Sequence, residues 1–220
     1  MIATDNLLSL VRNAVNEMST TGDDFSTMVD NALFSFVSMA APMLALEVLP
    51  VYQQTVSVSH TATDNDNFYM RPDGRTVARV PVPENFCRFI SFFAEGWSSP
   101  VGILRSQASP LYASQLSSSP GVGSGSASPS VFLVEKFEDG ILSSFIEGHS
   151  LPSPSAFTLS YTPVPQVNET QVDMDGRLIG ALAYYTASLY LQSINDVNGS
   201  KAAFDMAQNL IVKLNSISII

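Results

Sequence analysis

The sequence predicts an α+β fold in which both chain ends form one helical bundle and the middle forms an inserted, antiparallel β-rich section, sandwich-like or barrel-like. Apolar residues recur at helical spacing in residues 1–50 and again in residues 173–220. Between them, residues 51–172 carry short runs in which apolar and polar residues alternate, as in strands. A helical hairpin at either end would leave its apolar stripe uncovered, so we expect the two ends to pack together as one discontinuous domain.

The N-terminal part is expected to form two helices. Asp5 is placed to cap the first helix, whose apolar residues recur on one face. The second helix is expected to begin at Asp23 and to carry an apolar stripe from Phe25 to Ala40. Pro42 is expected to kink or end it, because the proline ring removes a backbone hydrogen bond and clashes with the preceding turn. The apolar face of the first helix consists of Leu7, Leu8, Val11, Val15 and Met18.

The middle section is expected to contain about six to eight short strands. Arg71-Pro72-Asp73-Gly74 and Glu138-Asp139-Gly140 are typical of hairpin turns. The Ser/Gly-rich segment 117–130 has little to bury, so it is expected to be a flexible loop, or alternatively an arm that orders against a neighbouring subunit. The expected strands lie at 56–59, 75–82, 86–93, 101–104, 131–134, 141–146 and 157–161.

The C-terminal part is expected to form two helices joined by a short loop at 195–199. Asp173 or Asp175 is placed to cap the first of them, and Ser200 the second. The apolar face of the first consists of Leu178, Leu182, Tyr185 and Leu189, followed by Gln192, and that of the second of Ala203, Phe204, Ala207, Leu210, Ile211 and Leu214.

The composition favours a protein that contacts neighbouring subunits. Charged residues make up only 14% of the chain, against roughly 25% in an average soluble protein, and the net charge is −10. No cluster of Lys or Arg occurs, so tight binding of nucleic acid is not expected, although an acidic wall lets DNA slide past it. The most apolar segment, 33–51, contains Pro42, Glu47 and Pro50, which favours a buried helix over a membrane span and predicts a soluble protein.

The sequence shows no pattern of catalytic or metal-binding residues. Cys87 is the only cysteine and is expected to be a buried, inert thiol. His60 and His149 are the only histidines and do not stand at a metal-ligand spacing. Ser124 and Ser126 lack the Gly-x-Ser-x-Gly pattern of a nucleophile, and no phosphate-binding glycine motif is present. We therefore expect no enzyme activity, no cofactor and no metal.

A more specific pattern runs through the middle section. Val82–Phe92 contains Pro83, Phe86 and Arg88 as Pro-x-x-Phe-x-Arg, and Gly96-Trp97 and Ser109-Pro110-Leu111-Tyr112 followed by Gln115 come after it. This order resembles the ring, or head–tail adaptor, proteins of crAss-like tailed phages. The C-terminal helical hairpin around residues 183–191 is also similar to the terminal helices of phage adaptors. The chain departs from the resemblance after Gln115, where the Ser/Gly-rich segment replaces a more ordered, basic turn.

The resemblance implies a structural subunit of the virion. Copies of the chain would form a closed ring of about twelve subunits that stacks on the portal protein or on adjacent tail ring proteins at the head–tail junction. Genomic double-stranded DNA would pass through the lumen without sequence-specific binding, and the subunit would occupy the host cytoplasm during assembly and contact no membrane. The candidate structural and interface residues are Pro83, Phe86, Arg88, Trp97, Tyr112 and Gln115.

Several alternatives remain open at this point. Arg88 would either face solvent on an edge strand or pair with a carboxylate across a subunit boundary. The chain would alternatively be another virion subunit, bound to the capsid or at the tail tip. It would also fit a carbohydrate-binding β domain with Trp97, Tyr52, Tyr69 and Tyr112 lining a sugar site. An enzyme would need a catalytic group built from one of the two histidines.

Overall fold

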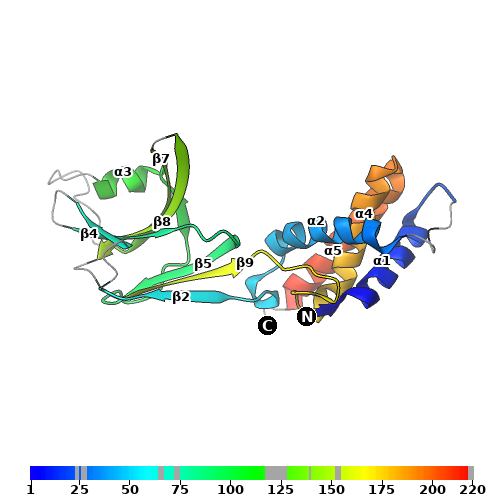
Figure 1. Cartoon of the computed structure of the whole chain (residues 1–220), viewed down its shortest axis with the longest axis horizontal. Coiled ribbons are helices and arrows are strands. Elements are labelled where there is room, and N and C mark those ends of the chain that lie inside the picture. Colours follow the sequence, from blue (N-terminus) through cyan, green and yellow to red (C-terminus); the bar gives the residue numbers. More distant parts are fainter. Residues whose placement is uncertain are drawn as a thin grey trace. The chain divides into compact units, whose positions relative to one another are not determined.

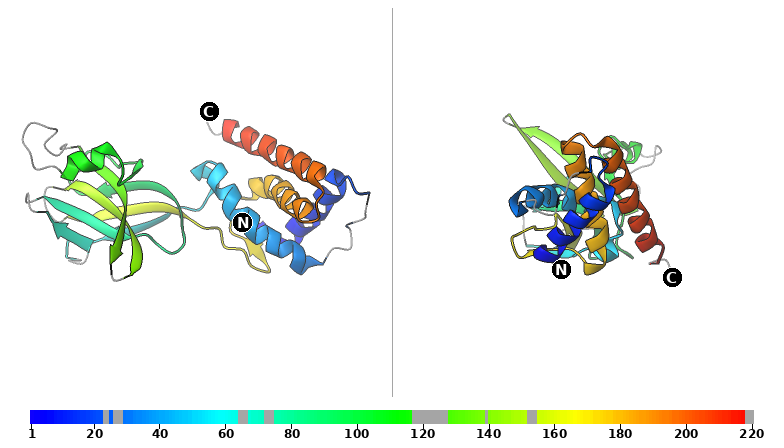
Figure 2. Two further views of the ribbon diagram at one scale, coloured as in Figure 1. Left: turned by 90° about the horizontal axis from the view of Figure 1, so that it is seen from above. Right: turned by 90° about the vertical axis from the view of Figure 1, so that its right-hand side faces the viewer.

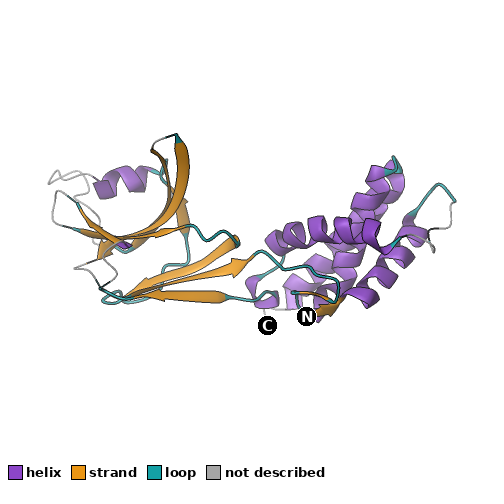
Figure 3. Cartoon of the chain, viewed as in Figure 1, coloured by secondary structure: helices purple, strands orange, loops and turns teal. Residues whose placement is uncertain are grey.

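The computed structural model is a mixed α+β structure (Figure 3). It describes residues 1–22, 25, 29–63, 67–71, 75–116, 128–138, 140–151 and 155–217. The chain divides into two compact units. Residues 1–54 and 163–220 form the helical unit, and residues 55–162 form the β unit.

Helix α4 is the centre of the helical unit, since α1, α2 and α5 all pack against it (Figures 1 and 2). Small and apolar side chains make this position possible, and Ala181, Leu182, Ala187 and Leu191 are buried. The α-helices of the unit are α1 (Thr4–Met18), α2 (Asp30–Glu47), α4 (Ile179–Ser193) and α5 (Val197–Ile217). The unit also contains the antiparallel pair β1 (Ile2–Ala3) and β10 (Gln171–Val172) and the 3-10 helices η1 (Pro50–Tyr52) and η3 (Gly176–Leu178).

The N-terminal helices differ from the sequence prediction at their ends. Helix α1 begins at Thr4, so Asp5 lies in its first turn and is not its cap. Helix α2 continues through Pro42 to Glu47, because the residues beyond the proline, Leu44 and Ala45, are fully buried and hold the last turn in place. Asp23, the expected start of this helix, lies outside the described residues. The apolar face predicted for α1 is buried at Leu7, Leu8, Val11 and Val15.

Aspartates cap η3 and α5, whereas α4 follows η3 directly and has no side-chain cap. Asp175 accepts a hydrogen bond from the backbone N–H of Arg177 at 2.8 Å at the start of η3, as one of the two predicted caps. The prediction for the last helix was wrong, since Asp196, and not Ser200, accepts a hydrogen bond from the N–H of Gly199 at 3.0 Å. Helix α5 therefore begins three residues earlier than Ser200, at Val197.

The β unit contains two sheets. The five-stranded sheet has the order β3-β4-β8-β7-β6, and the three-stranded sheet has the order β2-β9-β5. The strands of the first are β3 (Phe68–Met70), β4 (Thr76–Pro81), β6 (Leu104–Ser106), β7 (Ser130–Glu138) and β8 (Ile141–Leu151), and those of the second are β2 (Val56–His60), β5 (Phe86–Ala94) and β9 (Phe157–Pro163).

One strand pair departs from the antiparallel arrangement predicted for this section. Strands β6 and β7 pair in parallel, with Leu104 opposite Val131. A parallel pair needs a long crossover connection. The segment between these strands contains helix α3 (Pro110–Leu116), which the sequence analysis did not predict.

An apolar core connects the two sheets. Phe92 of β5 stacks on Phe157 of β9 with ring centroids 5.0 Å apart. Trp97 also packs against Phe92, with ring centroids 5.6 Å apart. Gly148 of β8 faces this core, where a Cβ atom would lie 2.6 Å from the Phe92 ring. Any larger residue at position 148 would therefore push the two sheets apart.

Most of the predicted strands are present, with local differences. Val101 forms only an isolated bridge with Phe92, so the strand predicted at 101–104 lies instead at Leu104–Ser106. Ser130 begins strand β7 and is buried, so the expected loop ends before it, while residues 117–127 lie outside the described residues. The pairing of β7 with β8 is that of the hairpin predicted around residues 138–140, although Asp139 is not described. The other predicted hairpin differs, since the expected strand 56–59 pairs with β9 and β4 pairs instead with β3, a strand that was not predicted, while residues 72–74 are not described.

Candidate functional site

Three of the predicted site residues meet at a bulge in strand β8. Ser150 has a φ of 72°, and its carbonyl accepts a hydrogen bond from Trp97 Nε1 at 3.3 Å. Its hydroxyl donates to Gln115 Oε1 at 3.4 Å, and Gln115 is buried at the end of α3. Tyr112, one turn earlier on α3, packs its ring against His149 at 5.6 Å. The bulge thus fastens α3 to the five-stranded sheet.

The other three predicted site residues lie away from this bulge, around the start of strand β5. Pro83 begins a turn in which its carbonyl accepts the N–H of Phe86 at 3.0 Å. Phe86 stacks on Tyr161 of β9 at 5.6 Å. Arg88 is half-buried on β5, which is an edge strand of its sheet. Cys87 beside it is also half-buried, and burial raises the pKa of its thiol, so the thiolate that would react is disfavoured.

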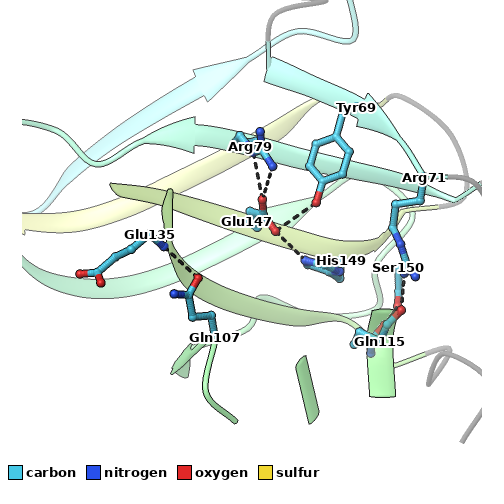
Figure 4. A network of polar contacts seen from close by, with 9 residues as sticks. All are labelled: Tyr69, Arg71, Arg79, Gln107, Gln115, Glu135, Glu147, His149 and Ser150. Carbon is cyan, nitrogen blue, oxygen red and sulfur yellow. Dashed lines mark hydrogen bonds and ion pairs between the residues drawn. The ribbon is translucent and has the colours of Figure 1, made fainter. Parts of the chain in front are cut away.

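A buried polar cluster, which the sequence analysis missed, surrounds the carboxylate of Glu147 (Figure 4). Glu147 is fully buried on β8, directly opposite Arg79 of β4. Arg79 donates from Nε at 2.9 Å and from Nη2 at 2.6 Å to Oε1. The Tyr69 hydroxyl donates to Oε2 at 3.1 Å, and His149 Nε2 lies 3.0 Å from the same oxygen. Both carboxylate oxygens are thereby saturated with donors.

The strand geometry explains why these side chains converge. Residues two apart on a strand point to the same face, so Glu147 and His149 project together on the side opposite Gly148 and the core. Tyr69 lies on β3, next to β4, and its ring centre is 4.3 Å from the guanidinium carbon of Arg79. Arg71 extends from the end of β3 and donates to the carbonyl of Gln115, which connects the end of β3 to α3.

The electrostatics of the cluster favour a permanently ionised Glu147. Burial alone would raise the pKa of Glu147, but the hydrogen bonds from His149 and Arg79 outweigh it and hold the pKa below its ordinary value. Burial and the nearby carboxylate raise the pKa of Tyr69 and of Tyr112, so both phenols stay protonated. Nδ1 of His149 is buried and makes no hydrogen bond within the described residues.

The cluster is suited to holding secondary structure together. Its carboxylate has no oxygen left to act as a base or a ligand, and no group of three or more His, Cys, Asp or Glu residues that would hold a metal occurs among the described residues. One signal in the sequence pointed to it, since Glu147 and His149 flank a glycine in a strand with apolar residues on both sides. Their partner Arg79 is 68 residues away in sequence from Glu147 and gave no such signal.

Two exposed apolar surfaces are the remaining candidates for function. The first is the tip of the hairpin formed by β7 and β8 (Figure 1), here called the finger. Its exposed apolar residues are Phe137, Ile141 and Leu142. These side chains are 73%, 66% and 60% exposed. Phe137 and Leu142 are register partners, so they stand side by side on one face. Exposed apolar residues gathered in this way are typical of interaction sites.

The second surface is a groove of about 390 Å³ on the helical unit, here called the α2–α5 groove. Its apolar lining includes Met43 of α2, Tyr185 and Leu189 of α4 and Val197 and Phe204 of α5. Helix α2 extends this surface with an exposed stripe at Met39, Met43 and Leu46, one turn apart, opposite its buried face.

The four aromatic residues proposed for a sugar site are divided between the two units, with Tyr52 in the helical unit and Tyr69, Trp97 and Tyr112 in the β unit. Tyr52 is buried within the helical unit, where its hydroxyl donates to the Leu214 carbonyl at 2.6 Å. Trp97 is buried in the core of the β unit, and the Tyr69 hydroxyl is held by Glu147. The polar groups of Tyr52, Tyr69 and Trp97 are therefore all engaged in hydrogen bonds within the chain.

No helix within the described ranges is both long and apolar enough to cross a membrane. Neither a scan against protein-family models nor a search of curated proteins finds a match to the chain.

Proposed function

We propose that the chain is a non-enzymatic structural subunit of a tailed phage, forming an adaptor ring at the head–tail junction. Copies of the chain would close into a ring of about twelve subunits around the DNA passage and stack on the portal or on a neighbouring tail ring. In this proposal, the residues with the family-like pattern hold the β unit in shape, and the exposed surfaces make the contacts between subunits.

The observation that carries the proposal is the presence of two different apolar surfaces, the finger and the α2–α5 groove, one on each unit. A ring requires two distinct faces on each subunit, because every copy must contact its two neighbours through different surfaces. A symmetric dimer needs only one self-complementary patch. The low content of charged residues supports the same reading, since charged residues are depleted in the centres of subunit interfaces.

The helical unit is the part we propose to form a bundle from both chain ends, as the sequence predicts. The packing of α1 and α2 against α4 supports it, since this joins residues from the two ends of the chain. Such a body would be a rigid platform for axial stacking, while the inserted β unit would reach toward neighbouring copies. The net charge of −10 favours a lumen that repels DNA and lets it slide.

Reconstitution with portal rings tests this function. The purified chain is mixed with assembled portal from the same virus, and the complex is imaged by electron microscopy. We expect an additional ring on one axial face of the portal. A chain that decorates the capsid shell, or a portal that remains bare at saturating concentrations of the chain, would contradict the proposal.

A further inference from the structure

The finger is a two-stranded ribbon, and within the described part of the chain no third strand pairs along it. Strand β4 pairs with β8 only as far as Phe145, and β6 pairs with β7 only over residues 131–133. The last pairs of the hairpin, up to Glu138 opposite Ile141, are made by β7 and β8 alone. An isolated two-stranded ribbon is marginally stable in water, and an apolar end makes contact with a further surface favourable.

The described charge on the same face as the apolar end of the finger is acidic. Glu135 is exposed and lies two residues before Phe137 on strand β7, so the two side chains point to the same face. The one basic residue there, Lys136, has its ammonium 5.9 Å from the centre of the Tyr69 ring, so its charge is directed toward the body of the sheet. A surface that accepts the finger should therefore be apolar with a positive charge at its rim.

The α2–α5 groove has this composition. Lys201 is the single charged residue that lines it, beside exposed Val197. Its floor is aromatic, with Tyr185 and Phe204 packed edge to face at 5.6 Å. The Tyr185 hydroxyl donates to Glu47 at 3.0 Å, which fixes the orientation of this ring. A further aromatic side chain can therefore pack against a floor that is already ordered.

We infer that the finger of one copy docks in the α2–α5 groove of the next copy, with Phe137 and Leu142 against the aromatic floor and Glu135 beside Lys201. The partner of each surface is therefore a second copy of this chain. This contact is heterologous, since it joins two different surfaces, and it leaves one finger and one groove free on every assembled pair. The inference rests on the proposed function and supplies its lateral contact.

Complementation between two variants tests the inference. The finger variant carries Phe137→Ser and Leu142→Ser, and the groove variant carries Val197→Glu and Lys201→Glu. All four positions are exposed or line the open groove, and an acidic residue at the start of α5 suits the helix dipole, so both variants should melt like the wild type. Val212→Glu, also exposed on α5 but outside the groove lining, is the matched control.

Sedimentation velocity then separates the outcomes. We expect the wild type and Val212→Glu to self-associate, and each contact variant alone to lose at least about tenfold in self-association. A mixture of the two variants should form a 1:1 dimer of twice 23.7 kDa and no larger species. The intact finger of the groove variant binds the intact groove of the finger variant, and the two surfaces left free on this dimer both carry substitutions.

Three results would overturn the inference. If both contact variants assemble like the wild type, or if their mixture stays monomeric while the wild type assembles, the lateral contact lies elsewhere and the proposed ring function is unaffected. If the wild type itself stays monomeric at all concentrations, the finger and the groove do not bind each other. The proposed function is then judged separately by the addition of the chain to portal rings.

Discussion

At the scale of single residues, Glu147 is the centre of the buried polar cluster in the β unit. Its carboxylate is fully buried and joins β8 to Arg79 on β4, to Tyr69 on β3 and to His149. Such a group is costly to bury unless its partners are all in place. The arrangement therefore favours one register among these strands, since a slip of one residue would turn Glu147 into the apolar core.

Glu147→Ala should destabilise the chain strongly. The change leaves Arg79 and His149 without their shared acceptor, and breaking a buried pair costs about 3 to 5 kcal/mol. Urea unfolding followed by circular dichroism measures the free energy of unfolding. Glu135→Ala, at an exposed carboxylate on the neighbouring strand, should change it by less than about 0.5 kcal/mol. Equal effects of the two substitutions would show that the cluster does not hold the sheet.

At the scale of elements, Asp196 connects the end of α1 to the start of α5. It accepts hydrogen bonds from the Thr20 N–H at 2.7 Å, the Thr20 hydroxyl at 2.6 Å and the Gly199 N–H at 3.0 Å. The Thr20 bonds are the main reason that the pKa of Asp196 is lowered from 3.8 to about 2. The ionised form is thus favoured in the folded chain over the unfolded chain.

The contribution of Asp196 to stability should depend on pH in acid. Because the folded pKa is depressed, this contribution is complete above pH 3.8 and disappears as the pH falls through about 2. We expect the melting temperature of Asp196→Ala to lie below that of the wild type near neutral pH, and the gap to shrink between pH 4 and pH 2. Thermal melts followed by circular dichroism over this range measure the gap, and a constant gap would contradict the assignment.

Local sequence patterns predicted most helices and strands, but they could not predict the contacts between residues far apart in the chain. The helical repeat in α1 identified its buried face, since periodicity needs no knowledge of the partner. Helix α2 passes Pro42 because packing of Leu44 outweighs the local cost, which the sequence cannot show. Helix α3 does have a local signal in the sequence, since Pro110 stands at its first position after a serine.

The candidate site was predictable only in part, for the same reason. Tyr112 and Gln115 were identified from a sequence pattern, and both contact the cluster around His149 and Ser150. The role of Glu147 was not predicted, because its pairing with Arg79 depends on the register between β4 and β8. That register is set by residues far apart in the chain.

At the scale of the whole molecule, the β unit is built as an insertion. It enters through β2 and leaves through β9, and Val56 and Tyr161 at these ends are register partners. Adjacent ends and a separate apolar core are the properties of a segment that folds by itself. A fragment of residues 55–162 should therefore give a cooperative thermal transition and a β-type circular dichroism spectrum. A fragment that remains unfolded would show that the helical unit is needed to close the two sheets.

The central claim is that copies of this chain form a closed ring. Mass photometry of the purified chain, followed by negative-stain imaging of the large species, tests it most directly. The account predicts a population near twelve times 23.7 kDa with a central hole, or the appearance of that ring once portal is added. A chain that remains a monomer alone and also with portal rings would contradict the account.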